Sequence, residues 1–337
     1  MTATDPVRAI ADAVLYEGYI LWPYRRSALK NQKRWTFGGV HPRGHTAEHP
    51  DDAWTMRTES LLEGGPDATV EIRVRFLHVV RRRVGRAEGD GLELVDELEV
   101  AGERHLAWEE AVEREVVVGP AAVGSISVCG RRAAIAVAAG SEREDLRHAD
   151  GTRAGALIRS WHALDGAVEV AAERLGAALW RLSVTIANTT PWEGGAREDA
   201  LERTFCSTHT VLRTDGGAFV SLTDPPAGLR AHAEACENAG TWPVLVGDAG
   251  ATDTLLSSPI ILEDHPRIAP ESPGDLFDGG EIDQMLVLNI LSLTDAEKAE
   301  MRASDPRAAE ILDRTEALTP EEVMRLHGTI RDWQVIR

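Results

Sequence analysis

The clearest alternation of hydrophobic and polar residues lies at residues 69–76, which read TVEIRVRF. Successive side chains of an extended chain point to opposite faces, so Val70, Ile72, Val74 and Phe76 share one face. Charged residues occupy most of the positions between them. The pattern therefore predicts a strand with one buried face and one solvated face.

Similar short segments continue as far as residue 192, and turns rich in Gly, Pro, Asn and Asp separate them. We expect further strands at residues 92–100, 114–118, 125–129, 132–138, 167–174 and 180–187. Many short strands at this spacing are typical of an antiparallel sandwich or a strongly curved sheet. Residues 16–192 are therefore predicted to form a β-rich, sandwich-like domain.

The pattern changes near residue 193, beyond which strands and helices are mixed. We expect strands at residues 218–222 and 243–246 and helices at residues 226–238 and 282–293. The last of these segments also fits a strand, because Leu286, Leu288 and Ile290 alternate with other residues, but helical spacing fits it better. Residues 193–293 are therefore predicted to be a mixed α/β segment.

Helix start signals follow one another near the C-terminus. They are the capping box from Thr294 to Glu297, Asp305 before Pro306, and Thr319 before Pro320. Residues 294–337 are therefore predicted to form a helical tail, and another helix is expected at residues 5–15. The predicted fold class is α+β.

The formal net charge of −19 at pH 7 restricts the partners that we expect. Nucleic acids and anionic membranes both attract basic surfaces, so neither is expected to bind. No apolar run is long enough to span a membrane. The three cysteines are widely spaced and form no CxxC motif, and the N-terminus does not resemble a signal peptide. These features predict a cytoplasmic protein.

Histidine recurs every four residues, next to two aspartates, in a segment that also contains proline and glycine. The residues are His41, His45, His49, Asp51 and Asp52. The prolines and the glycine predict a loop in place of a helix. Imidazole suits zinc, nickel and copper, so His41, His45 and His49 are candidate ligands of a divalent transition metal. The alternative is a solvated loop with unrelated histidines.

A stiff acidic stretch lies between residues 257 and 301, where four prolines precede a group of carboxylates. The carboxylates are Asp275, Asp278, Glu281 and Asp283. They can cap the following helix, form a docking surface for a basic partner, or hold a hard cation such as calcium or magnesium. No histidine or cysteine lies among them, so docking is favoured over catalysis if the stretch is functional.

All three tyrosines of the chain lie in residues 16–35, together with two tryptophans and five basic residues. Arginine forks and aromatic faces suit an anion or a carboxylate-bearing partner, for which Tyr24, Arg25 and Arg26 are candidate contacts. Packing of aromatic rings beside a solvated basic turn is the alternative.

A thiol, two hydroxyls and an imidazole follow one another from Cys206 to His209. A nucleophile and its base must meet through space, which neighbours on one strand rarely do, so we expect a polar strand packed in the interior. The chain contains no GxxxxGK[ST], GxSxG or HExxH motif and no strand–GxGxxG–helix unit. No catalytic residue is therefore assigned.

Two segments resemble a protein family of uncharacterised function that is associated with the gene clusters of nickel–iron uptake hydrogenases in soil actinobacteria and related bacteria. They are VLYEGYILWPYRRSALKNQKRWTFGGVHP and SSPIILEDHPRIAPESPGDLFDGGEIDQML. The resemblance implies an accessory, assembly or maturation role in which the protein binds a hydrogenase subunit or maturation factor. It does not imply hydrogenase activity, because the chain lacks the paired CxxC motifs that hold a nickel–iron centre.

The leading hypothesis is therefore a non-enzymatic cytosolic accessory protein that acts by protein–protein binding. The alternative hypothesis is a metal-dependent enzyme or metal carrier that uses the histidine segment or the acidic stretch.

Overall fold

The computed structural model describes residues 6–17, 19–25, 28, 31, 34, 37–267 and 283–325. Four of the residues predicted to contact a partner lie outside this range, namely Arg26, Asp275, Asp278 and Glu281. Of Asp283, only the backbone is described.

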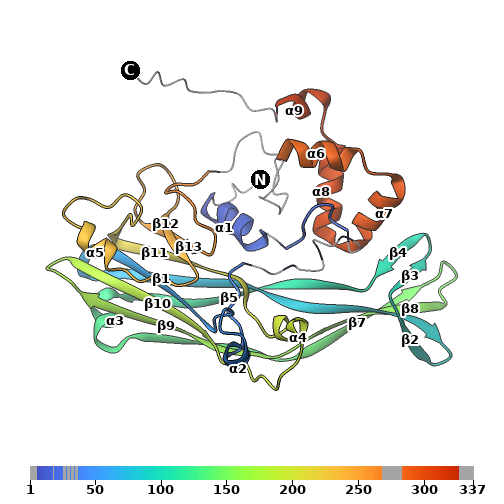
Figure 1. Cartoon of the computed structure of the whole chain (residues 1–337), viewed down its shortest axis with the longest axis horizontal. Helices are drawn as coiled ribbons and strands as arrows, with labels where there is room; N and C mark the ends of the chain where they lie inside the picture. The colour runs from blue at the N-terminus through green and yellow to red at the C-terminus, as the bar shows by residue number, and fades with distance from the viewer. Residues whose placement is uncertain are drawn as a thin grey trace.

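One antiparallel sheet of eleven strands dominates the described chain (Figure 1). Its strands are β1 (Thr55–Glu88), β2 (Gly91–Val95), β5 (Trp108–Ala122), β6 (Arg131–Val137), β7 (Gly140–Arg147), β8 (Arg153–Trp161), β9 (Leu164–Arg174), β10 (Leu179–Asn188), β11 (Cys206–Val220), β12 (Trp242–Leu245) and β13 (Thr254–Ser258). The longest path through it is β12-β13-β11-β1-β10-β9-β6. A separate hairpin consists of β3 (Glu97–Val100) and β4 (Glu103–Leu106).

Helices accompany this sheet (Figure 1). They are α1 (Pro6–Tyr16), α2 (Arg43–Glu48), α3 (Val123–Cys129), α4 (Arg197–Leu201), α5 (Arg230–Glu234), α6 (Asp283–Leu291), α7 (Asp295–Ser304), α8 (Pro306–Glu316) and α9 (Pro320–Arg325). Figure 1 shows α1 and the cluster α6–α9 above the sheet, whereas α2 and α4 are drawn over its lower strands near the middle of the view.

Strand β1 organises the sheet because its 34 residues are enough to pair with five other strands in turn. One of its edges meets β10, β5 and then β2, and the other edge meets β11 and then β8. Neighbouring strands twist relative to one another, so a sheet built along so long a strand coils. Side chains from β1, β5, β6, β9, β10 and β11 accordingly meet in one hydrophobic core.

The predicted strand at residues 69–76 lies within β1, and its predicted inner face is confirmed, since Val70, Ile72, Val74 and Phe76 are all buried. The alternation ends at Leu77, which is buried as well. Leu77 and Val79 belong to a second core that the helices α6 and α8 cover, whereas Phe76 belongs to the first. A strand covered on both faces loses its wet side.

The helix starts predicted from capping residues are confirmed. In α7, the Thr294 hydroxyl accepts from the Glu297 N–H, and the Glu297 carboxylate accepts from the Thr294 N–H at 2.9 Å. In α8, the Asp305 carboxylate accepts from the Arg307 N–H at 2.8 Å. Each bond satisfies a backbone donor that the first turn leaves without an intrahelical partner. In the apolar run at residues 282–293, the predicted helix is present as α6, which spans Asp283–Leu291.

The prediction of a strand at residues 125–129 is wrong, because this segment belongs to helix α3. Ile126 and Val128 alternate as in a strand, but Val128 is 86% exposed. The side chains that enter the core are Val123 and Ile126, which are three residues apart and so lie on one face of a helix.

The helix expected at residues 226–238 is much shorter, since α5 spans only Arg230–Glu234. The residues after it bond to β1 in place of continuing the helix. The Glu237 N–H donates to the Glu59 carboxylate at 2.7 Å, and the Asn238 amide oxygen accepts from the Glu59 N–H at 2.8 Å.

The α+β fold class, with a β-rich sheet and a helical C-terminal region, is confirmed. Strands β11, β12 and β13, from the segment predicted as mixed, join the same sheet as β1. Among the described helices, none has both the length and the apolar character needed to cross a bilayer.

Candidate functional site

Two of the three predicted histidines meet a carboxylate in the structure. His45 Nε2 lies 2.9 Å from Asp52 Oδ2, and His41 Nε2 lies 3.6 Å from Asp52 Oδ1. One ligand atom from each of the three residues lies within 4.8 Å of the others. Both histidines are buried, whereas the Asp52 side chain is 37% exposed, so the group opens to solvent on the side of the carboxylate.

Backbone bonds fold this segment back on itself. The His41 N–H donates to the Ala53 carbonyl at 2.8 Å, and the Asp52 N–H donates to the His49 carbonyl at 3.0 Å. The Thr46 hydroxyl donates to the Asp52 carbonyl at 2.7 Å. These contacts bring Asp52 over the face of α2 that carries His45.

The prediction of a loop for the histidine segment is wrong, because α2 makes residues 43–48 helical. Pro42 precedes the first turn, where a missing N–H costs no helical bond, and Pro50 follows the last turn. Gly44 is accommodated because α2 packs closely on Trp192. A Cβ added at Gly44 would stand 3.0 Å from the Trp192 Cβ.

His49 is not a member of the group of three ligand atoms. It follows the last residue of α2 and is exposed, and its ring lies 4.4 Å from the ring of His45. The residue that takes the third place is Asp52, which the sequence placed beside the histidines without indicating that it would meet them.

A second contact determines which nitrogen of His41 is free to bind. The Thr204 hydroxyl donates to the Ala200 carbonyl at 2.8 Å and lies 3.2 Å from His41 Nδ1. The hydroxyl has a single proton, which it donates to Ala200, so it must accept the hydrogen bond from His41 Nδ1–H. In the neutral ring Nε2 then carries the lone pair, which faces Asp52. Such a partner on the far nitrogen is usual for metal-binding histidines.

The electrostatics of the group favour a neutral imidazole and an ionised carboxylate. Burial lowers the pKa of His41 to about 4, although the charge of Asp52 acts to raise it. Burial acts to raise the pKa of Asp52, but the hydrogen bond to His45 and the nearby positive charges outweigh it and lower that pKa. Both ligand types are then in the protonation state that metal binding requires.

Two packing features describe how closely the site is built. A Cβ added at Gly39 would stand 2.8 Å from His41 Nε2, so the glycine leaves space at the liganding nitrogen. His45 Nδ1 is buried without a described hydrogen-bond partner, and the ring packs edge-on against Trp192 at 5.3 Å. The far nitrogen of His41 therefore has the Thr204 hydroxyl as a partner, whereas His45 is held by packing and by its hydrogen bond to Asp52.

The segment from Cys206 to His209 is a buried strand start, as expected, and offers no accessible nucleophile. Burial raises the pKa of Cys206 to about 12, so the thiol is protonated at neutral pH. The Ser207 hydroxyl donates to the Val14 carbonyl at 3.2 Å. Burial, with a smaller effect of the Arg75 charge, lowers the pKa of His209 to about 3.

His209 makes stability dependent on pH. Below about pH 6.5 the imidazole takes up a proton in the unfolded chain but not in the folded one, until the folded pKa near 3 is reached. We expect this to cost about 1.4 kcal/mol of unfolding free energy per pH unit as the pH falls from 6 to 4.5. Urea unfolding of the His209→Asn variant should show a slope smaller by that amount.

The control for this measurement is His148→Asn, because His148 is exposed. This variant should keep the wild-type slope. An unchanged slope in the His209 variant would mean that the buried ring takes up its proton in the folded state.

Of the aromatic and basic residues predicted to contact a partner, Tyr24 is fully buried. It belongs to the core between the N-terminal segment and the helices α6 and α8. Arg25 donates to the Glu297 carboxylate of α7 at 2.8 Å. Both residues therefore join the N-terminal segment to the helical region.

No model of a known protein family matches the chain. No curated protein matches it at a significant level. The function is therefore argued from the site itself.

Proposed function

We propose that the protein binds one divalent transition-metal ion through His41, His45 and Asp52 and serves as an accessory or carrier protein. The observation that carries the proposal is the meeting of two imidazoles and a carboxylate within 4.8 Å. These ligand types suit zinc, nickel, copper and iron. Three protein ligands leave one coordination position open for water or for a group from another molecule. A carrier needs such an open position to transfer the metal.

The wider role that we propose is assembly or maturation of a nickel–iron hydrogenase in the cytoplasm. Its support is the sequence resemblance, whose first segment, residues 14–42, includes His41 and Gly39. The three cysteines are free, as is usual in a reducing compartment. Co-purification of hydrogenase subunits or maturation factors with the protein from its native host tests this role separately from the metal site.

Metal titration of the purified protein tests the site. We expect wild type to take up one Zn²⁺, Ni²⁺ or Co²⁺ per chain. His41→Ala, His45→Ala and Asp52→Asn should each weaken binding by at least about 10- to 100-fold, the loss found even for residues that only orient ligands. Gly39→Ala keeps all three ligands and should also weaken binding, because its Cβ would crowd His41 Nε2.

His49→Ala is the matched control, because His49 lies next to His45 but outside the group of ligand atoms. Its metal affinity should equal that of wild type. Equal uptake by wild type and the three ligand variants would show that the histidines and Asp52 only hold α2 in place by hydrogen bonds. A loss in His49→Ala as large as in His41→Ala would assign the third ligand to His49.

A further inference from the structure

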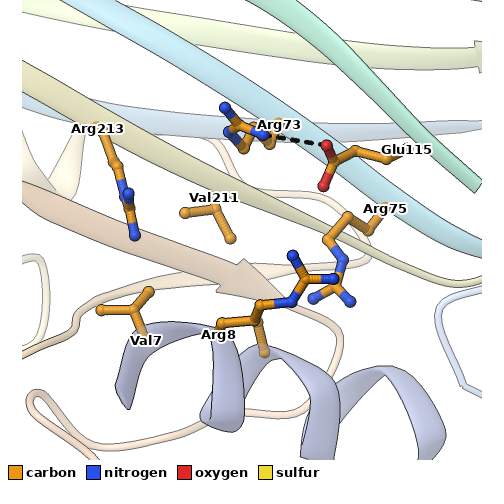
Figure 2. A pocket seen from close by; sticks show the side chains of 8 residues that line it. Val7, Arg8, Arg73, Arg75, Glu115, Val211 and Arg213 are labelled. Carbon is orange, nitrogen blue, oxygen red and sulfur yellow. Dashed lines mark hydrogen bonds and ion pairs between the residues drawn. The ribbon is translucent and has the colours of Figure 1, made fainter. Parts of the chain in front are cut away.

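Two hollows of this acidic protein are rich in arginine, and they differ in how their charge is balanced. The first, of about 260 Å³, lies between α1 and strands β1 and β11 (Figure 2). Its arginines are Arg8, Arg73, Arg75 and Arg213. The carboxylates in ion pairs with this group are Asp12, Glu71, Glu113 and Glu115. Figure 2 shows Glu115 reaching Arg73. Four carboxylates thus balance four arginines.

The second hollow, of about 490 Å³, lies where β1, the start of β5 and α4 approach one another. Its arginines are Arg34, Arg81, Arg82, Arg83 and Arg197. Its volume is in the range of small-molecule sites. We call it the arginine pocket.

Two of these arginines form fixed walls. Arg34 is buried, lies over the Trp108 ring at 3.9 Å, donates to the backbone carbonyls of Tyr19 and Glu109, and pairs with the Glu109 carboxylate at 3.5 Å. Arg82 is also buried and pairs with Glu110 at 2.8 Å. Guanidinium groups held in this way lose little freedom when a ligand binds.

The other three differ in their partners. Arg81 pairs with the buried carboxylate of Glu202. Arg83, on β1, and Arg197, on α4, form no ion pair with any described carboxylate. Glu198 also lines the pocket, but it forms no ion pair with either of them. The pocket therefore presents two guanidinium groups from separate elements that are available to an anion.

We propose that the arginine pocket binds a small multivalent anion that carries carboxylate or phosphate groups. Arg83 and Arg197 are the residues that contact the oxygens of the anion. Guanidinium groups bind both kinds of oxygen in a bidentate manner. The proposal uses no ligand of the metal site, although the charge of Arg197 also acts on His41 and Asp52.

Isothermal titration of chelator-treated full-length protein tests the proposal, with citrate and pyrophosphate as probes at constant ionic strength. We expect saturable binding of one anion per chain. The probe that binds more tightly shows whether the pocket prefers carboxylate or phosphate groups. Arg83→Gln and Arg197→Gln should each weaken binding by about 10- to 100-fold, the loss that corresponds to one charge-assisted hydrogen bond. Neither variant breaks a described ion pair, so both should fold.

Arg8→Gln is the matched control, because it removes an exposed arginine from the balanced hollow. It should leave binding unchanged. The proposal is overturned if neither probe binds saturably, if both pocket variants bind as wild type does, or if Arg8→Gln weakens binding as much as they do.

Discussion

Replacement of Arg82 by methionine is expected to lower the free energy of unfolding by about 3–5 kcal/mol, the cost of breaking a buried ion pair. The side chain is only 8% exposed and comes from the C-terminal part of β1. Its guanidinium pairs with Glu110 and donates to three backbone carbonyls, those of Leu106, Ala303 and Ser304. Methionine fills similar space but leaves these acceptors without a donor.

The same contacts join the end of α7 to the sheet, so the effect should extend to the helical region. Limited proteolysis of Arg82→Met should cut within residues 283–325 faster than in wild type. Urea unfolding, followed by circular dichroism, measures the loss of stability.

Arg159→Met is the matched control, because Arg159 also pairs with Glu110 but is 27% exposed. Arg159 is more exposed than Arg82 and donates only to carboxylates, so this variant should be destabilised by less than Arg82→Met. Equal losses in the two variants would show that the pair with Glu110, and not the three carbonyls of Leu106, Ala303 and Ser304, holds the helical region in place.

Replacement of Phe76 by alanine is the second large effect, with an expected loss of about 3–5 kcal/mol. Phe76 is fully buried in the core of the coiled sheet, and its ring lies 4.7 Å from the ring of Phe205. Alanine removes the apolar surface and leaves a cavity that strands on both sides prevent from closing. Urea unfolding at constant pH measures the change.

Phe37→Ala removes the same group from a site that is 43% exposed and should change stability by about 0.5 kcal/mol or less. A melting midpoint of Phe76→Ala equal to that of wild type would be incompatible with the core described for β1.

Local patterns predicted the parts of the fold that depend on residues a few positions apart. The alternation around Val70 and Phe76 identified the middle of β1 because side-chain direction in a strand repeats every two residues. The capping residues Thr294 and Asp305 identified the starts of α7 and α8 because the bonds that they make lie within one turn. The error at α3 arose where two periods fit the same residues, and packing of Val123 in the core decided between them.

The candidate metal site was predicted only in part. His41 and His45 were recognised from their spacing, but His49 was given the place that Asp52 takes. Thr204 was not recognised at all, since 163 residues separate it from His41 and no local pattern relates them. The arginine pocket was missed for the same reason, because its charged groups come from β1, α4 and the N-terminal segment.

The sequence by itself determined the α+β class, the inner face of β1 and the helix starts of the C-terminal region, because these follow from interactions within one turn or one strand. Only the tertiary structure decided which carboxylate faces the histidines, which arginines of the pocket have no ion-pair partner among the described residues, and where the second face of β1 is covered. Each of these depends on contacts between segments far apart along the chain. Such contacts form only when the sheet coils and the helices pack on it, and burial then determines the charge state of the groups that they bring together.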